Sequence, residues 1–141
     1  SAKCQEVLPD DMFVSPPEGP LREQLRAIGT AFFALITSDE AINMHRMMST
    51  PDAAEHGLRE LFWNAGPRRT QEVFAGFLQA RVNEGKLRIE DVPLAASQFF
   101  SLLKGELHPM MACGLCPEPG PAEVTRHIDA TVDFFLRAYA A

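Results

Sequence analysis

The sequence predicts an all-α protein, a bundle of about six helices. Apolar residues recur at three- and four-residue steps along most of the chain, prolines stand where helices would begin, and alternating strand patterns are nearly absent. Proline is tolerated in the first turn of a helix because the N–H that it lacks would have no helical partner there. A chain of 141 residues can bury a core without disulfides, so one helical domain is expected.

Two segments of different character divide the chain. Residues 1–19 hold a short helix-like stretch and then a loop rich in proline and acidic residues, so we expect the tail of a linking helix plus a loop. Residues 20–141 form the domain proper. Within it the predicted helices span residues 20–37, 39–49, 51–65, 67–83, 93–110 and 121–139.

The first three helices are predicted from their apolar stripes and their capping residues. Residues 20–37 carry an amphipathic stripe, and Ser38 is the expected N-cap of residues 39–49, whose first turn holds two carboxylates. Residues 51–65 begin at a proline and gather their large apolar side chains near the end. Gly57 weakens the middle of that helix.

The last three helices are longer and more apolar. Residues 67–83 begin at a proline, and Gly85 is a good stop signal after them. Residues 93–110 and 121–139 carry apolar side chains on more than one face. Pro109 is expected to kink or end the first of these two.

Charge and hydropathy exclude several classes of protein. The formal net charge is −6 and the sequence pI is about 5.2, whereas a domain that grips DNA by itself normally carries a basic patch. No apolar run approaches the ~18 residues of a membrane span, and no apolar leader opens the chain. We therefore expect a cytoplasmic protein with no membrane partner.

Residue patterns for catalysis are missing. The sequence holds neither a glycine-rich phosphate-binding loop nor the G-x-S-x-G motif of a serine nucleophile. Its four histidines have no partner at metal-ligand spacing on their own helices. Cys113 and Cys116 form a C-x-x-C pair, but without the βαβ setting of a redox motif or a second pair for zinc. We predict no catalytic residue, no cofactor and no metal. A thiol protein built on this pair is a third-ranked alternative.

The two last predicted helices point to self-association. A helix that is apolar on two faces must bury both, and in a chain this small a second copy can cover one of them. Two helices from each copy would then make a four-helix interface about a two-fold axis. The expected homodimer interface consists of Phe100, Leu107, Val124, Ile128, Thr131, Val132, Phe135 and Tyr139.

The order of these elements resembles the C-terminal domain of TetR-family transcriptional regulators, in particular the AefR-like subgroup. The resemblance covers residues 21–139. Its matching segments are LFWNAGP at 61–67, GKLR at 85–88 with Asp91, AASQFF at 95–100 and LLKG at 102–105. It implies a helix-turn-helix domain N-terminal to this one, which this sequence does not contain, and contact with DNA only through that domain.

The resemblance also implies a ligand pocket within the bundle, and the sequence offers suitable side chains. Methionine is flexible and polarizable, and ten Phe, six Met and one Trp are present. We expect the pocket of a small hydrophobic effector to be lined by Phe33, Ile36, Met44, Met47, Met48, Phe62, Trp63, Phe74, Phe77, Phe99 and Leu103, with His45 and His108 as polar anchors.

The implied mechanism is a population shift. The effector binds one arrangement of the bundle better than another and thereby alters the DNA affinity of the N-terminal domain, most simply of a repressor. The main alternative is a helical protein–protein interaction module that dimerises and holds no ligand.

Overall fold

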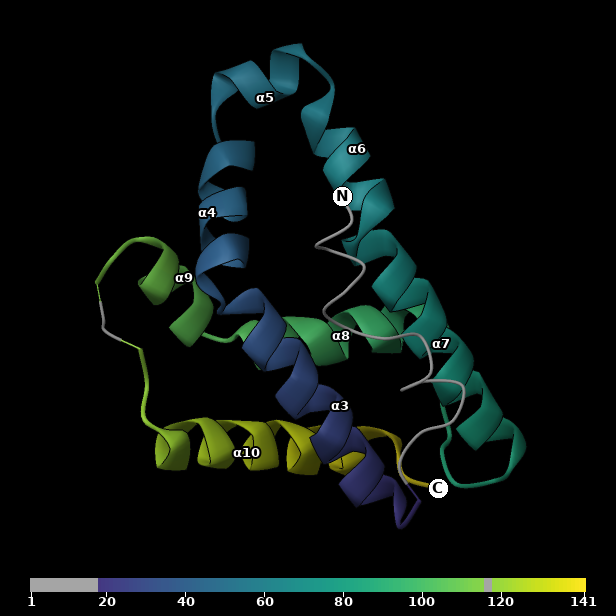
Figure 1. The fold of residues 1–141 in the computed structure, drawn as a ribbon. Coiled ribbons are helices and arrows are strands. Elements are labelled where there is room, and N and C mark those ends of the chain that lie inside the picture. Colours follow the sequence, from purple (N-terminus) through teal and green to yellow (C-terminus); the bar gives the residue numbers. More distant parts are fainter. Residues whose placement is uncertain (1–17, 116–117) are drawn as a thin grey trace.

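The computed structural model describes residues 18–115 and 118–141, and the all-α prediction is confirmed for them (Figure 1). The predicted tail of a linking helix falls in residues 1–17, outside the described part. The helices are α3 (Leu21–Ile36), α4 (Asp39–Met48), α5 (Pro51–Glu55), α6 (Leu58–Ala65), α7 (Pro67–Asn83), α8 (Val92–Lys104), α9 (Leu107–Ala112) and α10 (Pro121–Tyr139).

Two predicted helices are each broken in two at a glycine. Gly57, with φ of 66°, separates α5 from α6, and Gly105, with φ of 50°, separates α8 from α9. Positive φ is the region that residues with a Cβ avoid, so these two positions end the hydrogen-bond ladder. The expectation that Pro109 would end or kink a helix is wrong, because Pro109 lies in the first turn of α9, where no helical N–H is needed.

The core lies where α3, α7, α8 and α10 meet. Phe99 of α8 is fully buried, with its ring centroid 5.0 Å from that of Phe74 on α7 and 5.1 Å from that of Phe135 on α10. The Phe32 ring of α3 lies 4.2 Å from Phe100. Aromatic pairs at these separations add to the hydrophobic burial of each ring, so these contacts hold the four helices together.

Close helix contact in this core requires a small residue on α3. A Cβ placed on Gly29 would lie 3.3 Å from a methyl carbon of Leu103 and 3.4 Å from one of Ile128. Glycine at this position therefore lets the backbone of α3 approach both α8 and α10.

Helices α4, α5 and α6 form an arm, residues 39–65, that extends away from this core (Figure 1). None of its residues belongs to the core cluster, and its only buried apolar side chains among the described residues are Ile42 and Ala53. In the described part of the chain no helix is both long and apolar enough to cross a membrane.

Candidate functional site

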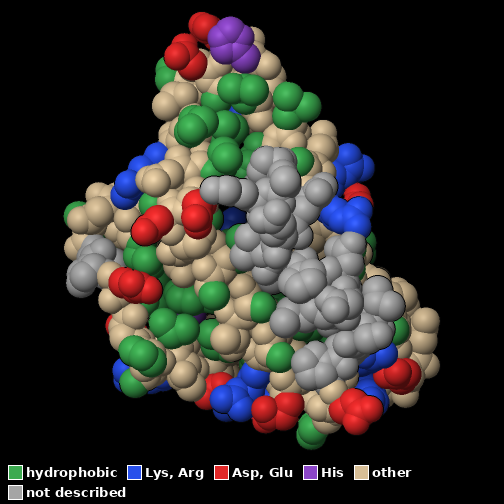
Figure 2. All heavy atoms as spheres, in the orientation of Figure 1, with side chains coloured by type: hydrophobic (Ala, Val, Ile, Leu, Met, Phe, Trp, Pro, Cys, Tyr) green, Lys and Arg blue, Asp and Glu red, His purple; other side chains and the backbone are tan. Residues whose placement is uncertain are grey.

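Large apolar side chains lie on the surface of the arm. Met47 on α4 is 54% exposed, and on α6 Leu61 is 65% and Trp63 46% exposed. Figure 2 shows hydrophobic side chains gathered on this face below α5. Exposed apolar groups of this size are the usual mark of a surface that receives a ligand or a partner.

Backbone capping and one arginine hold the arm together. The Ser38 hydroxyl accepts a hydrogen bond from the Ala41 amide at 3.2 Å, which is the N-cap that the sequence predicts for α4. At the other end, Arg59 of α6 donates from Nε to the Met48 carbonyl at 2.7 Å and from Nη2 to the Thr50 carbonyl at 2.9 Å. These bonds tie α6 to the end of α4 across the short α5.

A histidine pair lies where the arm meets the rest of the bundle. The rings of His45 on α4 and His108 on α9 meet edge to face, with centroids 5.2 Å apart. Burial, followed by the charges of Lys104 and His45, lowers the pKa of His108 to about 4. His108 is therefore uncharged at neutral pH and can exchange a hydrogen bond with an uncharged ligand.

The predicted ligand-binding residues separate into two groups in the structure. Those in the core are buried and packed: Phe33, Phe74, Phe77, Phe99 and Leu103. Those on or near the arm are half-buried (Ile36, Met44, Met48, Phe62) or exposed (Met47, Trp63), with His45 exposed and His108 buried. The structure thus brings the methionines, Trp63 and the histidines to the arm and its base. It places the five core residues in the interior of the four-helix packing.

The predicted interface residues lie on the inner sides of α8, α9 and α10. Phe100, Ile128, Thr131, Val132 and Phe135 are buried within a single chain, and Leu107, Val124 and Tyr139 are half-buried and packed against the core cluster. The reason is that α3 covers the apolar stripe of α10, for which the sequence analysis expected a second copy as the partner. The surface that α10 offers to another molecule is therefore its opposite face.

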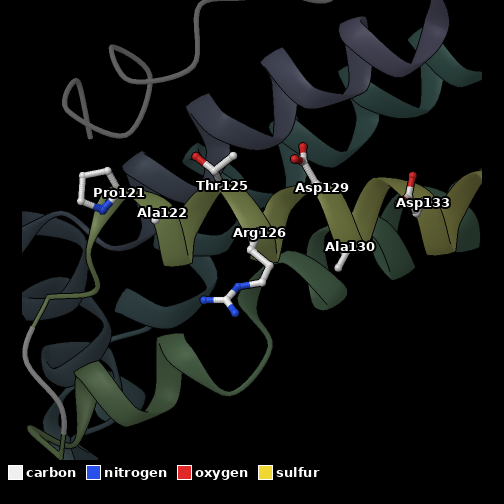
Figure 3. A pocket seen from close by; sticks show the side chains of 7 residues that line it. All are labelled: Pro121, Ala122, Thr125, Arg126, Asp129, Ala130 and Asp133. Carbon is white, nitrogen blue, oxygen red and sulfur yellow. The ribbon is translucent and has the colours of Figure 1, made fainter.

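That opposite face carries a shallow groove (Figure 3). The step of four residues from Ala122 through Arg126 and Ala130 to Phe134 places these four exposed residues along one side of the helix. Phe134 is 63% exposed, a large apolar ring on an otherwise polar face. The groove is lined by Pro121, Ala122, Thr125, Arg126, Asp129, Ala130 and Asp133.

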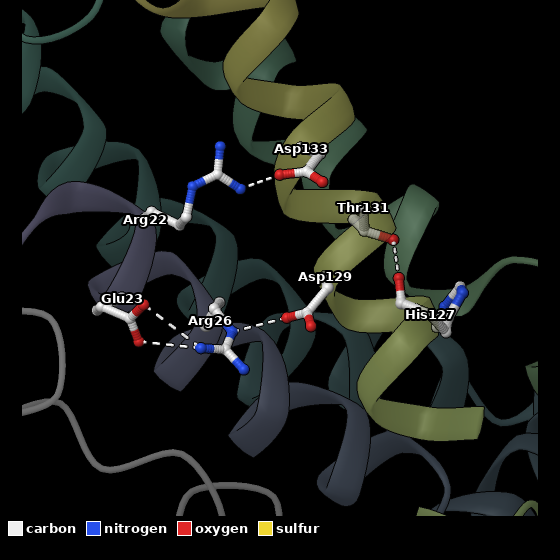
Figure 4. A network of polar contacts seen from close by, with 7 residues as sticks. All are labelled: Arg22, Glu23, Arg26, His127, Asp129, Thr131 and Asp133. Atoms are coloured by element: carbon white, nitrogen blue, oxygen red, sulfur yellow. Dashed lines mark hydrogen bonds and ion pairs between the residues drawn. The ribbon is translucent and has the colours of Figure 1, made fainter. Parts of the chain in front are cut away.

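Ion pairs bind α10 to α3 along one edge of the groove (Figure 4). Arg22 pairs with Asp133, and Arg26 donates from Nε to Asp129 at 2.6 Å while also pairing with Glu23 of its own helix. These side chains are partly exposed, so each pair contributes little to stability. Their effect is to fix the carboxylates of α10 beside the groove.

Arg46, Arg59 and Phe134 are the structural features that sequence reasoning missed. The outward position of Phe134 could have been predicted from the sequence. Arg126, Ala130 and Phe134 are spaced four residues apart, which places them on the helix face opposite Ile128 and Val132. The contacts of the two arginines could not, because nothing local shows that a helical arginine reaches a backbone carbonyl on another element.

The cysteine pair adds little to the site. Cys113 is exposed after α9, and Cys116 lies outside the described residues. In residues 18–115 and 118–141 no group of three or more His, Cys, Asp or Glu side chains is placed to hold a metal ion.

Comparisons with known proteins agree with this architecture. Residues 23–141 match the family model described as the C-terminal domain of AefR-like transcriptional repressors. No match was found among curated proteins by sequence comparison. In a solved structure named "Flavonoid-responsive Regulator FrrA", the match has 27% identity and a TM-score of 0.83, and covers 99% of this chain and 70% of that one.

Two further structures share the fold. A TetR-family regulator from Mesorhizobium loti MAFF303099 matches with 22% identity and a TM-score of 0.84, covering 99% of this chain and 71% of that one. A TetR-family regulator from Pseudomonas syringae pv. tomato DC3000 matches with 22% identity and a TM-score of 0.68, covering 93% of this chain and 69% of that one. Proteins of this family are regulators and not enzymes. The chain belongs to the C-terminal domain family of AefR-like TetR regulators, an effector-binding and dimerisation domain without enzymatic activity.

Proposed function

We propose that this domain senses a small apolar effector in the cytoplasm and that effector binding lowers the DNA affinity of an N-terminal helix-turn-helix domain, as in a repressor. The observation that carries the proposal is the arm: Met47, Leu61 and Trp63 are exposed there, while the core is filled by its own rings. The three solved regulators support the two-domain arrangement, because each extends beyond the part that this chain matches.

The side chains of the arm suggest the chemistry of the effector. Methionine thioethers and the indole of Trp63 favour flat aromatic rings, which stack on them through dispersion. The uncharged His108 at the base of the arm suits a hydroxyl or carbonyl group rather than an ion. The name of the 27% identical regulator says that it responds to flavonoids, which are molecules of this description, so naringenin is the first probe.

The proposed mechanism requires the effector to favour one position of the arm. Because α4–α6 adds nothing to the core cluster, the arm can shift at small cost compared with the four-helix core. The effector can alter DNA affinity only by its difference in affinity for the two positions. A few kcal/mol of such difference is enough for a population shift of two orders of magnitude.

Titration with naringenin is expected to change the fluorescence of Trp63, the single tryptophan of the chain. Met47→Ala is expected to weaken the affinity about tenfold, because its side chain loses roughly 1–2 kcal/mol of burial against the ligand. Isothermal titration calorimetry gives the two dissociation constants.

Leu94→Ala is the matched control, since Leu94 is 51% exposed on α8, outside the arm, and its loss is expected to leave the affinity unchanged. Equal affinities of Met47→Ala and the wild-type chain for naringenin would show that the arm is not part of the effector site. Absence of binding by naringenin and by other flat aromatic probes would favour the alternative, a dimerising module without a ligand.

We also propose that two copies associate through the outward face of α10. The face is self-complementary: if two α10 helices run antiparallel and cross at Asp129 and Ala130, equal offsets bring Arg126 beside Asp133 of the partner subunit. The small side chains of Ala122 and Ala130 leave room for Phe134. An exposed ring beside alanines, flanked by opposite charges, is the pattern of a hot spot with a polar rim.

Phe134→Glu is expected to raise the dimer dissociation constant at least 100-fold, because a carboxylate replaces the large apolar ring of the proposed contact. Sedimentation velocity over a concentration series measures the change. Leu94→Glu introduces the same charge at another exposed apolar position and is expected to leave the dimer intact. A Phe134→Glu protein that sediments as the wild-type dimer would place the interface elsewhere.

A further inference from the structure

Helix α9 is held at its C-terminal end by an arginine of α4. Arg46 donates from Nε to the Ala112 carbonyl at 2.8 Å and from Nη2 to the Met111 carbonyl at 3.3 Å. The last carbonyls of a helix have no partner within it and carry its negative dipole end. The guanidinium of Arg46 therefore satisfies the Ala112 carbonyl, adds a second donor to the Met111 carbonyl, and places a positive charge at the negative end of α9. The adjacent His45 makes a separate contact with α9, in which its ring meets the ring of His108 edge to face.

Besides Arg46, α9 is held by a backbone cap at its C-terminal end: with Gly114 at a φ of 72°, the Gly114 amide donates to the Met111 carbonyl at 3.0 Å and the Leu115 amide to the Met110 carbonyl at 2.8 Å. A helix of six residues is unstable by itself, because nucleation costs more than one or two hydrogen bonds return. Gly105 interrupts the hydrogen-bond ladder between α8 and α9, so α9 gains no helical continuity from α8. Leu107 and His108 pack inward, while Pro109 and Met110 are exposed.

The end of α8 is fixed independently of α9. Nε2–H of His127 on α10 donates to the Leu103 carbonyl at 2.6 Å, at the point where the α8 ladder stops. The His127 ring also lies 5.5 Å from that of Phe33 on α3. The chain therefore passes at Gly105 from an anchored helix to one that depends on α4.

Helix α4 in turn depends on its contact with α9. The only buried side chain of α4 is that of Ile42, so α4 has little hold on the core and gains from its contact with α9. Residues 113–120 then join α9 to α10, at whose start Pro121 and Ala122 line the groove on the outward face. The α4–α9 contact thus connects the arm to the beginning of the proposed dimer face.

We propose that α9 is a marginally stable helix whose folded population depends on Arg46 of α4, so that a movement of α4 that withdraws Arg46 shifts α9 towards its unfolded state. The inference rests on the proposed effector role of the arm, and it assigns Arg46 as the positioning residue of the coupling. Loss of the cap changes the local opening equilibrium of α9 without unfolding the four-helix core.

Hydrogen–deuterium exchange of the 141-residue chain tests the cap without any effector. Arg46→Gln is expected to speed exchange of the amides at residues 110–115 at least tenfold and to leave those of α8 unchanged. Arg59→Gln is the matched control, because Arg59 makes similar bonds to two carbonyls of the arm but does not touch α9. Unchanged exchange at 110–115 in Arg46→Gln, or equal acceleration in α8, overturns the proposal.

A second measurement tests the coupling itself. With naringenin bound, as reported by Trp63, the wild-type chain is expected to exchange faster at residues 110–115, towards the rate of Arg46→Gln. Binding that leaves this rate unchanged overturns the coupling. If naringenin does not bind, the proposed effector class is wrong, while the Arg46 and Arg59 comparison still decides whether α9 depends on its cap.

Discussion

Replacing Phe99 with alanine is expected to lower the free energy of unfolding by about 3–5 kcal/mol, because a fully buried ring leaves both lost burial and a cavity. Phe99 contacts three other rings, those of Phe74, Phe100 and Phe135, so its neighbours cannot all collapse into the space. In a domain of this size the expected fall in melting temperature is ~10–15 °C. Differential scanning calorimetry and urea titration measure it.

The matched comparison is Trp63→Ala, which removes an even larger ring from the arm. Trp63 is 46% exposed and lies outside the core cluster, so this substitution is expected to cost less than about 1 kcal/mol. Phe99 and Trp63 were both predicted to line the ligand pocket. Comparing the two variants shows which of the two residues stabilises the fold. A small effect of Phe99→Ala would mean that its ring lines an open pocket and not a packed interior.

Gly105→Ala is expected to lower the free energy of unfolding by about 2–4 kcal/mol. Its φ of 50° and ψ of −146° lie in a region that residues with a Cβ seldom occupy, which alone costs about 1–3 kcal/mol. An added Cβ would also lie 3.0 Å from Cε1 of His127. That ring cannot move away freely, because it donates to the Leu103 carbonyl. Urea unfolding followed by circular dichroism gives the value.

Gly85→Ala separates these two causes. Gly85 also has positive φ, 80°, but a Cβ there meets nothing within 4 Å, so the expected cost is about 1 kcal/mol. A double-mutant cycle of Gly105→Ala with His127→Ala then measures the contact directly. If Gly105→Ala cost no more than Gly85→Ala, the close approach of α10 to the break would not constrain the fold.

Local signals in the sequence were sufficient for several elements. The predicted range 67–83 is that of α7, and 121–139 is that of α10, because a proline and a glycine or loop mark their ends. The predicted N-cap at Ser38 is present. These features depend on residues within one turn of each other, which is why they can be read without the rest of the chain.

The division of the apolar residues between core and site was not readable in this way. Met47 and Phe99 both belong to apolar helices, yet one is 54% exposed and the other fully buried. Ligand binding by the predicted residues stays a prediction, and for the five core members the packing gives a structural role in its place. The hydrophobic pattern predicts that a side chain prefers burial. It does not predict whether the protein's own core, a ligand or a second copy covers that side chain.

By itself the sequence determined the helical class, the places where most helices begin, the acidic balance that excludes DNA binding by this domain alone, and the resemblance that led to its family. Only the tertiary structure decided that α3 covers the inner stripe of α10 and that Arg46 caps α9. The physical reason is that propensity and capping act between neighbours in the chain, whereas these contacts join residues far apart in it, such as Arg46 and Ala112, which are 66 positions apart.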